Sequence, residues 1–203
     1  MKIPSAKPSA YEVFLERSDN VKRLLYGAIK ARISGAESFG SHPDMRGNVC
    51  FEVKGRAVFG HGFVGDGHAG AVSIKVGRDA TLLVGDRVFL NSGVIIEAWH
   101  EVRIGNDVMM APLASIIDDS RHEIEPGAIR YKGPVVIGNN VWLTRNVSVL
   151  PGVSIGDGSV IGANSVVSRD IPPNSFAAGA PARVIRELAI PDGWVRSDGW
   201  EPS

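Results

Sequence analysis

Aliphatic residues recur every six positions along much of the chain. One unbroken series consists of Ile137, Leu143, Val149, Ile155, Ile161 and Val167. Two shorter series keep the same spacing, namely Val84, Leu90 and Ile96, then Ile104, Met110 and Ile116. A weaker series runs through Val58, Val64 and Val76, with Gly70 in the missing position. These series indicate a repeated structural unit.

A period of six matches neither the 3.6-residue turn of an α-helix nor the two-residue alternation of a long strand. It is typical of a short strand, a tight turn and another short strand, and three such units make one triangular coil of about 18 residues. The aliphatic side chain then points inward, and Gly or Asn at the corners tolerates a positive φ. The pattern predicts an all-β fold, a parallel β-helix over residues 51–171. We expect residues 1–50 to form an N-terminal extension that contains a helix, and residues 172–203 to form a C-terminal tail.

The longest interruption of the repeat separates Ile116 from Ile137, which are 21 residues apart. This distance exceeds one 18-residue coil by three residues, so we expect a loop of three extra residues, extruded at about 118–133. Its sequence, DDSRHEIEPGAIRYKG, is polar and contains two Gly and one Pro. A loop on a rigid scaffold is a common place for catalytic residues.

The two ends of the chain differ from the repeat. Apolar residues mark one helical face between Asn20 and Ser34, and such a helix would cover the open end of the β-helix and its unpaired strand edges. The tail at 191–203, which contains Trp194 and Trp200, is expected to pack on a subunit surface.

Composition narrows the class of protein without naming an activity. The 22 Lys and Arg balance the 22 Asp and Glu, which does not favour nucleic acid or a membrane surface as a partner. The single cysteine, Cys50, cannot form an internal disulfide, and the sequence has neither a signal-peptide pattern nor an apolar run long enough for a membrane span. These features favour a cytoplasmic location.

Two segments contain motifs beyond the six-residue repeat. They are residues 134–188, with AAGAPARVI after DIPPN, and residues 89–112, FLNSGVIIEAWHEVRIGNDVMMAP. Both segments resemble the galactoside and maltose O-acetyltransferases of the hexapeptide-repeat acyltransferases. The resemblance implies a left-handed β-helix, although parallel crossovers are normally right-handed. It also implies acetyl-CoA as co-substrate, a homotrimer with sites between subunits, and acetyl transfer to a hydroxyl of a sugar or polysaccharide precursor.

His122 takes the place of the catalytic histidine of these relatives. A histidine has the pKa required of a general base near neutral pH. Glu125, Asp118 or Asp119 could orient its ring, or all three could be solvated loop charges.

The resemblance also implies residues that bind the acceptor. Asn91 takes the place of an acceptor-binding asparagine, although Asn is common at β-helix corners anyway. Trp99 replaces the neighbouring acceptor-binding aspartate of the family, and Glu97 could act in its stead.

The cofactor groove is implied in the same way. Ala163, Ser168 and Arg169 would line it, and Arg183 and Arg186 would meet the phosphates, since arginine binds phosphate bidentately. Two further residues belong to this set: Trp142, in VWLTR where relatives have VWIG, and Arg145, near the thioester. Each arginine alone could equally be a solvated charge.

Two other functions stay open at this point. An N-acetyltransferase of a nucleotide-linked amino sugar shares the fold and the cofactor, and a non-catalytic β-helix scaffold needs neither. We expect no metal, because His61, His68 and His100 lack the ligand spacing of a zinc site.

Overall fold

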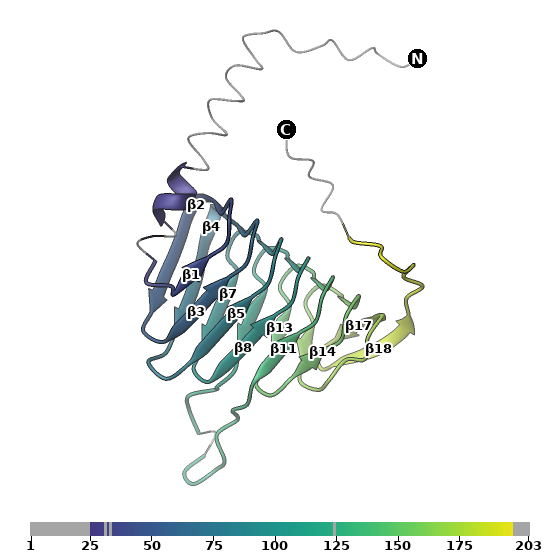
Figure 1. Ribbon diagram of the computed structural model, residues 1–203. Helices are drawn as coiled ribbons and strands as arrows, with labels where there is room; N and C mark the ends of the chain where they lie inside the picture. Colours follow the sequence, from purple (N-terminus) through teal and green to yellow (C-terminus); the bar gives the residue numbers. More distant parts are fainter. Residues whose placement is uncertain (1–24, 31, 33, 124, 197–203) are drawn as a thin grey trace, which may run out of the picture.

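The chain folds as a parallel β-solenoid of about seven turns (Figure 1). The computed structural model describes residues 25–30, 32, 34–123 and 125–196. Each turn consists of short strands that stack in register on the turns before and after it. The all-β fold and the repeat predicted from the sequence are therefore confirmed. The left-handed winding stays a prediction.

The strands form three flat faces, which we call A, B and C in the order in which each turn visits them. Face A contains β1 (Ser38–Phe39), β3 (Arg56–Phe59), β5 (Thr81–Val84), β8 (Glu101–Ile104), β11 (Val135–Ile137) and β14 (Ser154–Ile155). Face B contains β6 (Phe89–Leu90), β9 (Met109–Met110), β12 (Trp142–Leu143), β15 (Val160–Ile161) and β17 (Ser175–Gly179). Face C contains β7 (Ile95–Ala98), β10 (Ser115–Ile117), β13 (Ser148–Val149) and β16 (Val166–Val167).

Three strands depart from this scheme. The long strands β2 (Asp44–Val53) and β4 (Val64–Val76) run across faces B and C in one piece. The last strand, β18 (Ala182–Glu187), returns antiparallel to β17. Because β1 and β2 already pair in parallel with β3 and β4, the ladder begins before residue 51, and β17 extends it beyond residue 171.

The interior is a column of aliphatic side chains. The six residues from Ile137 to Val167 that share the six-residue spacing are at most 2% exposed. Leu143 pairs directly with Ile161, and Val149 with Val167. Each inward side chain therefore sits above an equivalent one, which removes the column from water.

The weak N-terminal series was right at Val76, which is 1% exposed, but wrong by one residue at Val58 and Val64. Val58 and Val64 are partly exposed, whereas Phe59 and Phe63 are at most 2% exposed and fill the interior. Their rings contact each other with centroids 5.0 Å apart, and Phe59 also stacks on Phe39 at 4.3 Å.

Phe59 pairs with Val84 and Gly65 with Leu90, so the six-residue spacing holds here one residue later than predicted. It breaks within β4, where Gly65 and Ile74, the partner of Ile96, are nine residues apart.

The loop at 118–133 is longer than expected. Met110 pairs with Leu143 after 33 residues, whereas Leu143 pairs with Ile161 after 18 residues. The loop therefore adds fifteen residues, and the expectation of three was wrong. The expectation assumed that Ile116 and Ile137 are one full coil apart. They lie on the consecutive faces C and A, which a separation of about six residues normally joins.

Residues 25–30 and 32 are helical, within the helix expected at 20–34, whose first residues lie outside the described part of the chain. Gly27 packs so closely against Pro43 that a Cβ would lie 2.0 Å from its carbonyl oxygen, and the Lys30 ammonium donates to the Val49 carbonyl at 2.6 Å. Leu25 and Ile29, however, are 61% and 53% exposed. The cap therefore stays a prediction. No helix in the described part of the chain is long and apolar enough to cross a membrane.

Candidate active site

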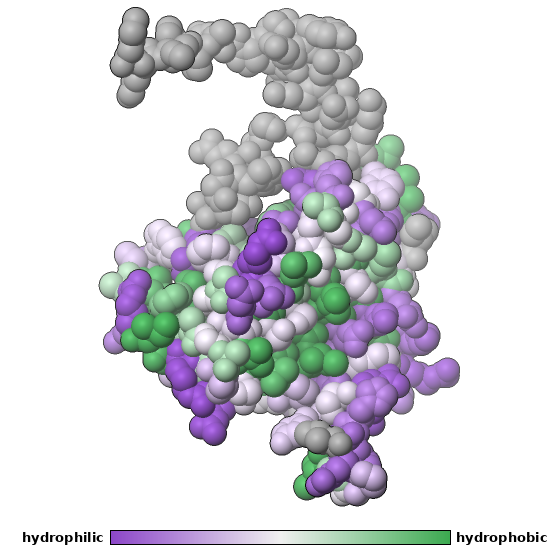
Figure 2. Space-filling view, turned by 180° about the vertical axis from the view of Figure 1, so that it is seen from behind, coloured by the Kyte–Doolittle hydropathy of each residue, from purple (hydrophilic) through white to green (hydrophobic). Residues whose placement is uncertain are grey.

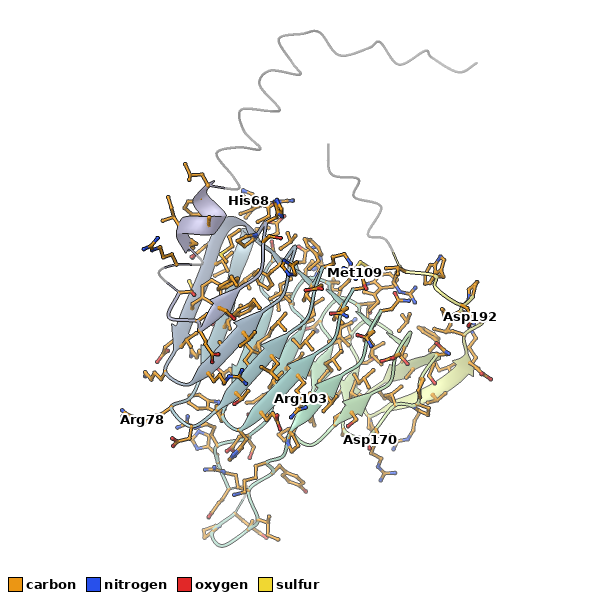
Figure 3. All side chains as sticks on the ribbon, viewed as in Figure 1. His68, Arg78, Arg103, Met109, Asp170 and Asp192 are labelled. Carbon is orange, nitrogen blue, oxygen red and sulfur yellow. The ribbon has the colours of Figure 1, made fainter. Side chains whose placement is uncertain are left out.

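The edges on either side of face C carry most of the predicted site residues. We call them the BC edge and the CA edge after the faces that they join. The loop at 118–133 projects from the CA edge, between β10 and β11 (Figure 1). Arg78 and Asp170, which lie in other corners of this edge, appear on the same side of the solenoid as the loop, whereas His68, near the BC edge, lies on the opposite side (Figure 3).

Two buried carboxylates fasten the loop to the coil before it. Asp118 accepts hydrogen bonds from the backbone N–H groups of Trp99 and His100 at 2.7 and 2.8 Å. Asp119 lies 3.0 Å from His100 Nε2 and accepts bonds from the Arg121 backbone and the Arg130 guanidinium at 2.7 and 2.5 Å. Both carboxylates are at most 1% exposed. They hold the base of the loop and do not contact His122.

The charge on Asp119 is stabilised in place. Burial alone would raise the pKa of this carboxyl, but the hydrogen bonds from Arg121 and His100 and the charge of Arg130 outweigh it and lower the pKa below its ordinary value. Asp119 is therefore ionised at neutral pH.

A stacked pair holds the residue that precedes His122. The Arg121 guanidinium lies 3.9 Å from the centre of the Trp99 ring, and Arg121 has a φ of 62°. The ring itself lies over Gly77, where a Cβ would be 2.8 Å from Trp99 Cε3. Trp99 thus supports the loop from the position for which the resemblance implies an acceptor-binding residue.

His122 extends into solvent from this anchored base. Its side chain is exposed and makes no hydrogen bond or ion pair within the described part of the chain, and Ser120 Oγ donates to its carbonyl at 3.1 Å. Two backbone bonds close the stem below it, from Ser120 to Tyr131 at 2.8 Å and from Gly133 to Asp118 at 3.0 Å. Glu125 is exposed and also does not contact His122. The residue that orients His122 stays open.

The BC edge carries a second group of predicted residues, namely Asn91, Arg145 and Ala163. Backbone hydrogen bonds join its successive turns, from Leu113 to Ser92, from Asn146 to Pro112 and from Asn164 to Arg145. Arg145 and Ala163 are exposed on this edge. The Oδ1 of Asn91 accepts from the Ser92 N–H at 2.7 Å within its own turn, which leaves the two Nδ2 hydrogens for a ligand.

A hollow of about 460 Å³ opens on face B beside Asn91, within the range of small-molecule sites. The C-terminal tail forms the outer part of this hollow, which was not predicted from the sequence. Asn140 holds the tail in place: its Nδ2 donates to the Trp194 carbonyl at 3.0 Å, and its Oδ1 accepts from the Arg196 N–H at 2.8 Å. The lining consists of Phe89, Asn91, Met109, Ala111, Trp142, Trp194 and Arg196.

The fold does not unite the two groups within one copy. Glu97, Ser168 and Arg169 lie at the CA side of face C, on the side of the loop, and Glu97 pairs with Lys75 at 3.5 Å. Arg183 and Arg186 are exposed on β18, where Arg186 lies over the Phe176 ring at 5.8 Å. Among the described residues, no three His, Cys, Asp or Glu side chains are grouped to hold a metal ion.

Comparison with known proteins identifies the repeat. Residues 134–169 match the family model for the bacterial transferase hexapeptide with six repeats. The coils over these residues are similar to the hexapeptide repeats of bacterial transferases. They contain Trp142, Arg145, Ala163, Ser168 and Arg169, whereas His122 and Asn91 precede them and Arg183 follows.

Relatives extend the similarity beyond the hexapeptide repeats. Galactoside O-acetyltransferase of Escherichia coli (strain K12) is 44% identical over 108 residues, which is 52% of this chain and 53% of that protein. The putative acetyltransferase YJL218W of Saccharomyces cerevisiae (strain ATCC 204508 / S288c) is 41% identical over 117 residues, 56% of this chain and 59% of that protein. The chain thus spans about half the length of the curated relatives it matches.

A solved structure supports the same fold over most of the chain. The polySia specific acetyltransferase NeuO superposes with a TM-score of 0.54 at 26% identity, over 82% of each chain.

Proposed function

We propose that the protein is an acetyl-CoA-dependent O-acetyltransferase that acts on a hydroxyl of a sugar or polysaccharide precursor. The observation that carries the proposal is the presentation of His122. A loop fastened by two buried carboxylates extends this unbonded imidazole from coils of the transferase hexapeptide type. The similarity to galactoside O-acetyltransferase and to a polySia specific acetyltransferase supports the reaction and the acceptor class.

His122 would act as general base and then as general acid. Its neutral imidazole takes the proton of the acceptor hydroxyl as the oxygen attacks the thioester carbonyl of acetyl-CoA. The tetrahedral intermediate collapses, the C–S bond breaks, and the imidazolium returns its proton to the departing thiolate. The acetyl group then forms an ester with the acceptor, and no covalent acyl-enzyme is required.

The residues on the BC edge and on β18 fit CoA. Ala163 is small and exposed, so a pantetheine arm can approach the backbone of the corner. The Arg145 cation on the same edge can stabilise the oxyanion of the intermediate or bind CoA. Arg183 and Arg186 are exposed guanidinium groups beyond the end of the repeat, suited to the phosphates. Ser168 and Arg169 lie on the CA side, so they would meet the cofactor only if another copy supplied the BC edge.

A second copy of the chain would bring the two edges together. Face C lies between them, and one outward row on it has no charged member. Its residues pair in register from turn to turn: Ser73, Ile95, Ser115, Ser148 and Val166. Ile95 is 43% exposed, and seen from behind, apolar side chains gather across the middle of the solenoid (Figure 2). Closed packing of three copies through this face would give the homotrimer with sites between subunits.

A panel of acceptors tests the reaction. Thiol release from acetyl-CoA would be measured with neutral sugars, charged sugars and nucleotide-linked amino sugars, and NMR would identify the acetylated atom. The proposal predicts release with a sugar hydroxyl and an O-acetyl product. An N-acetyl product alone would identify an N-acetyltransferase. Absence of thiol release with every acceptor would favour the alternative that the protein is a non-catalytic scaffold.

A further inference from the structure

Arg196 has no counter-ion among the residues that the structure describes. Its Nε is buried without a hydrogen-bond partner in this part of the chain, and its Nη2 makes one long bond to the Gly158 carbonyl at 3.4 Å. Burial lowers the pKa of the guanidinium. A partly buried charge without a counter-ion is costly, so the site gains from a ligand that brings a negative charge to the guanidinium.

Two tryptophans place this cation at the hollow on face B. The Arg196 guanidinium lies 4.9 Å from the centre of the Trp194 ring and 6.0 Å from that of Trp142. The two rings remain 42% and 37% exposed although they line the hollow. Their open faces provide apolar surface with a polar rim, which suits a ligand that has both a ring and polar substituents.

The hollow is otherwise apolar apart from Asn91. Phe89, Met109 and Ala111 contribute no charge, so orientation of a ligand would depend on the free Nδ2 hydrogens of Asn91 and on Arg196. Both groups donate hydrogen bonds, but the neutral amide suits a hydroxyl oxygen, whereas the charged guanidinium favours an anion.

We propose that this hollow binds a pyranose that carries an anionic group, a carboxylate or a phosphate. The proposal rests on the proposed function, for which it specifies the acceptor. Trp142, which the resemblance assigned to the cofactor groove, here packs with Trp194 against the sugar ring, because both line the hollow. Arg196 binds the anion, and Asn91 donates to a hydroxyl close to the reacting one. Trp194 and Arg196 of the C-terminal tail thereby determine specificity. A neutral sugar leaves the Arg196 guanidinium without a counter-ion and binds more weakly.

Calorimetric titration of the full chain without acetyl-CoA tests the site. The probes are methyl galactopyranoside, its uronate, galactose 6-phosphate and CoA. We expect at least one charged sugar to bind ten times or more tightly than the neutral one, and Arg196→Gln to abolish that difference. Arg196→Lys, which keeps the charge, should retain part of it. The control Arg103→Gln removes an exposed arginine of face A that pairs with Glu101, and should leave the difference unchanged.

Each outcome decides between the claims. Equal affinity for neutral and charged sugars overturns the proposal, and so does an Arg196→Gln variant that loses affinity for CoA alone, because the anion would then be a cofactor phosphate. The two charged sugars distinguish carboxylate from phosphate. Selective binding without thiol release would support the anionic sugar site and refute acetyl transfer. Thiol release without charge selectivity would support acetyl transfer and refute the anionic sugar site.

Discussion

The Arg121 guanidinium stacks on the Trp99 ring at 3.9 Å, so the residue directly before His122 rests on the preceding coil. Such a contact contributes about 0.5–2 kcal/mol depending on its desolvation. Together with the bonds to Asp118 and Asp119, it fixes where the loop leaves the solenoid. The position of His122 therefore depends on residues that need not touch a substrate.

Asp119→Asn should loosen the loop without unfolding the solenoid. The substitution removes a charge that accepts from Arg121 and Arg130, and each charged hydrogen bond contributes about 1.5–3 kcal/mol. We expect faster hydrogen exchange at residues 119–133, a turnover about tenfold lower and an unchanged melting temperature. Asp107→Asn, which breaks the exposed pair with Arg87, is the control. Wild-type exchange and turnover in Asp119→Asn would show that the carboxylate does not hold the loop.

The depressed pKa of Asp119 also fixes the pH range of this anchor. A carboxyl whose pKa is lowered on folding contributes stability above its ordinary pKa of 3.8 and loses it as the pH falls through the lower folded value. Because Asp119 stays ionised between about pH 5 and 8, its titration should not change the hydrogen-exchange protection of the loop in that range.

Paired substitutions test the register of the N-terminal turns. Phe59→Ala should cost about 3–5 kcal/mol of unfolding free energy, because the ring is 2% exposed and packs on Phe39 and Phe63. Val58→Ala, one residue away and partly exposed, should cost less than about 1 kcal/mol. Chemical denaturation measures both. Equal losses would contradict the register.

The sequence predicted the turns best where inward residues follow a strict six-residue spacing, as from Ile137 to Val167. It failed at Val58 and Val64, because β4 places the inward positions Gly65 and Ile74 nine residues apart, so counting back from Val76 in steps of six misses the interior by one residue. It gave no sign that Trp194 and Arg196 return to face B, since contacts with Asn140 join residues 54 and 56 positions apart. Likewise, the spacing of Asn91 and His122 could not show that they lie on different edges.

Arg183→Ala should weaken acetyl-CoA binding by about 1–3 kcal/mol, as expected for a lost charged hydrogen bond. The effect should appear in KM for acetyl-CoA and not in kcat, because the phosphates are remote from the reacting carbonyl. Arg103→Ala on face A is the control. Unchanged calorimetric affinity in both Arg183→Ala and Arg186→Ala would leave these two as solvated charges.

Ser115→Arg should dissociate the proposed trimer. It places a charge in the middle of the uncharged row on face C, whereas Val136→Arg places the same charge on the outside of face A. Sedimentation should show trimers for the wild type and Val136→Arg, and inactive monomers for Ser115→Arg. A monomer at micromolar concentration that keeps full turnover would show that one copy contains the whole site.

His122→Ala tests the central claim most directly. With a sugar acceptor identified from the panel, thiol release from acetyl-CoA would be followed for the wild type, His122→Ala and the control His61→Ala, which alters an exposed histidine between faces A and B that is hydrogen-bonded to Ser41. We predict that His122→Ala melts like the wild type and turns over about 10²–10⁴ times more slowly, the usual share of general base catalysis. A folded His122→Ala protein that keeps more than about a third of wild-type turnover, well outside that range, would contradict it.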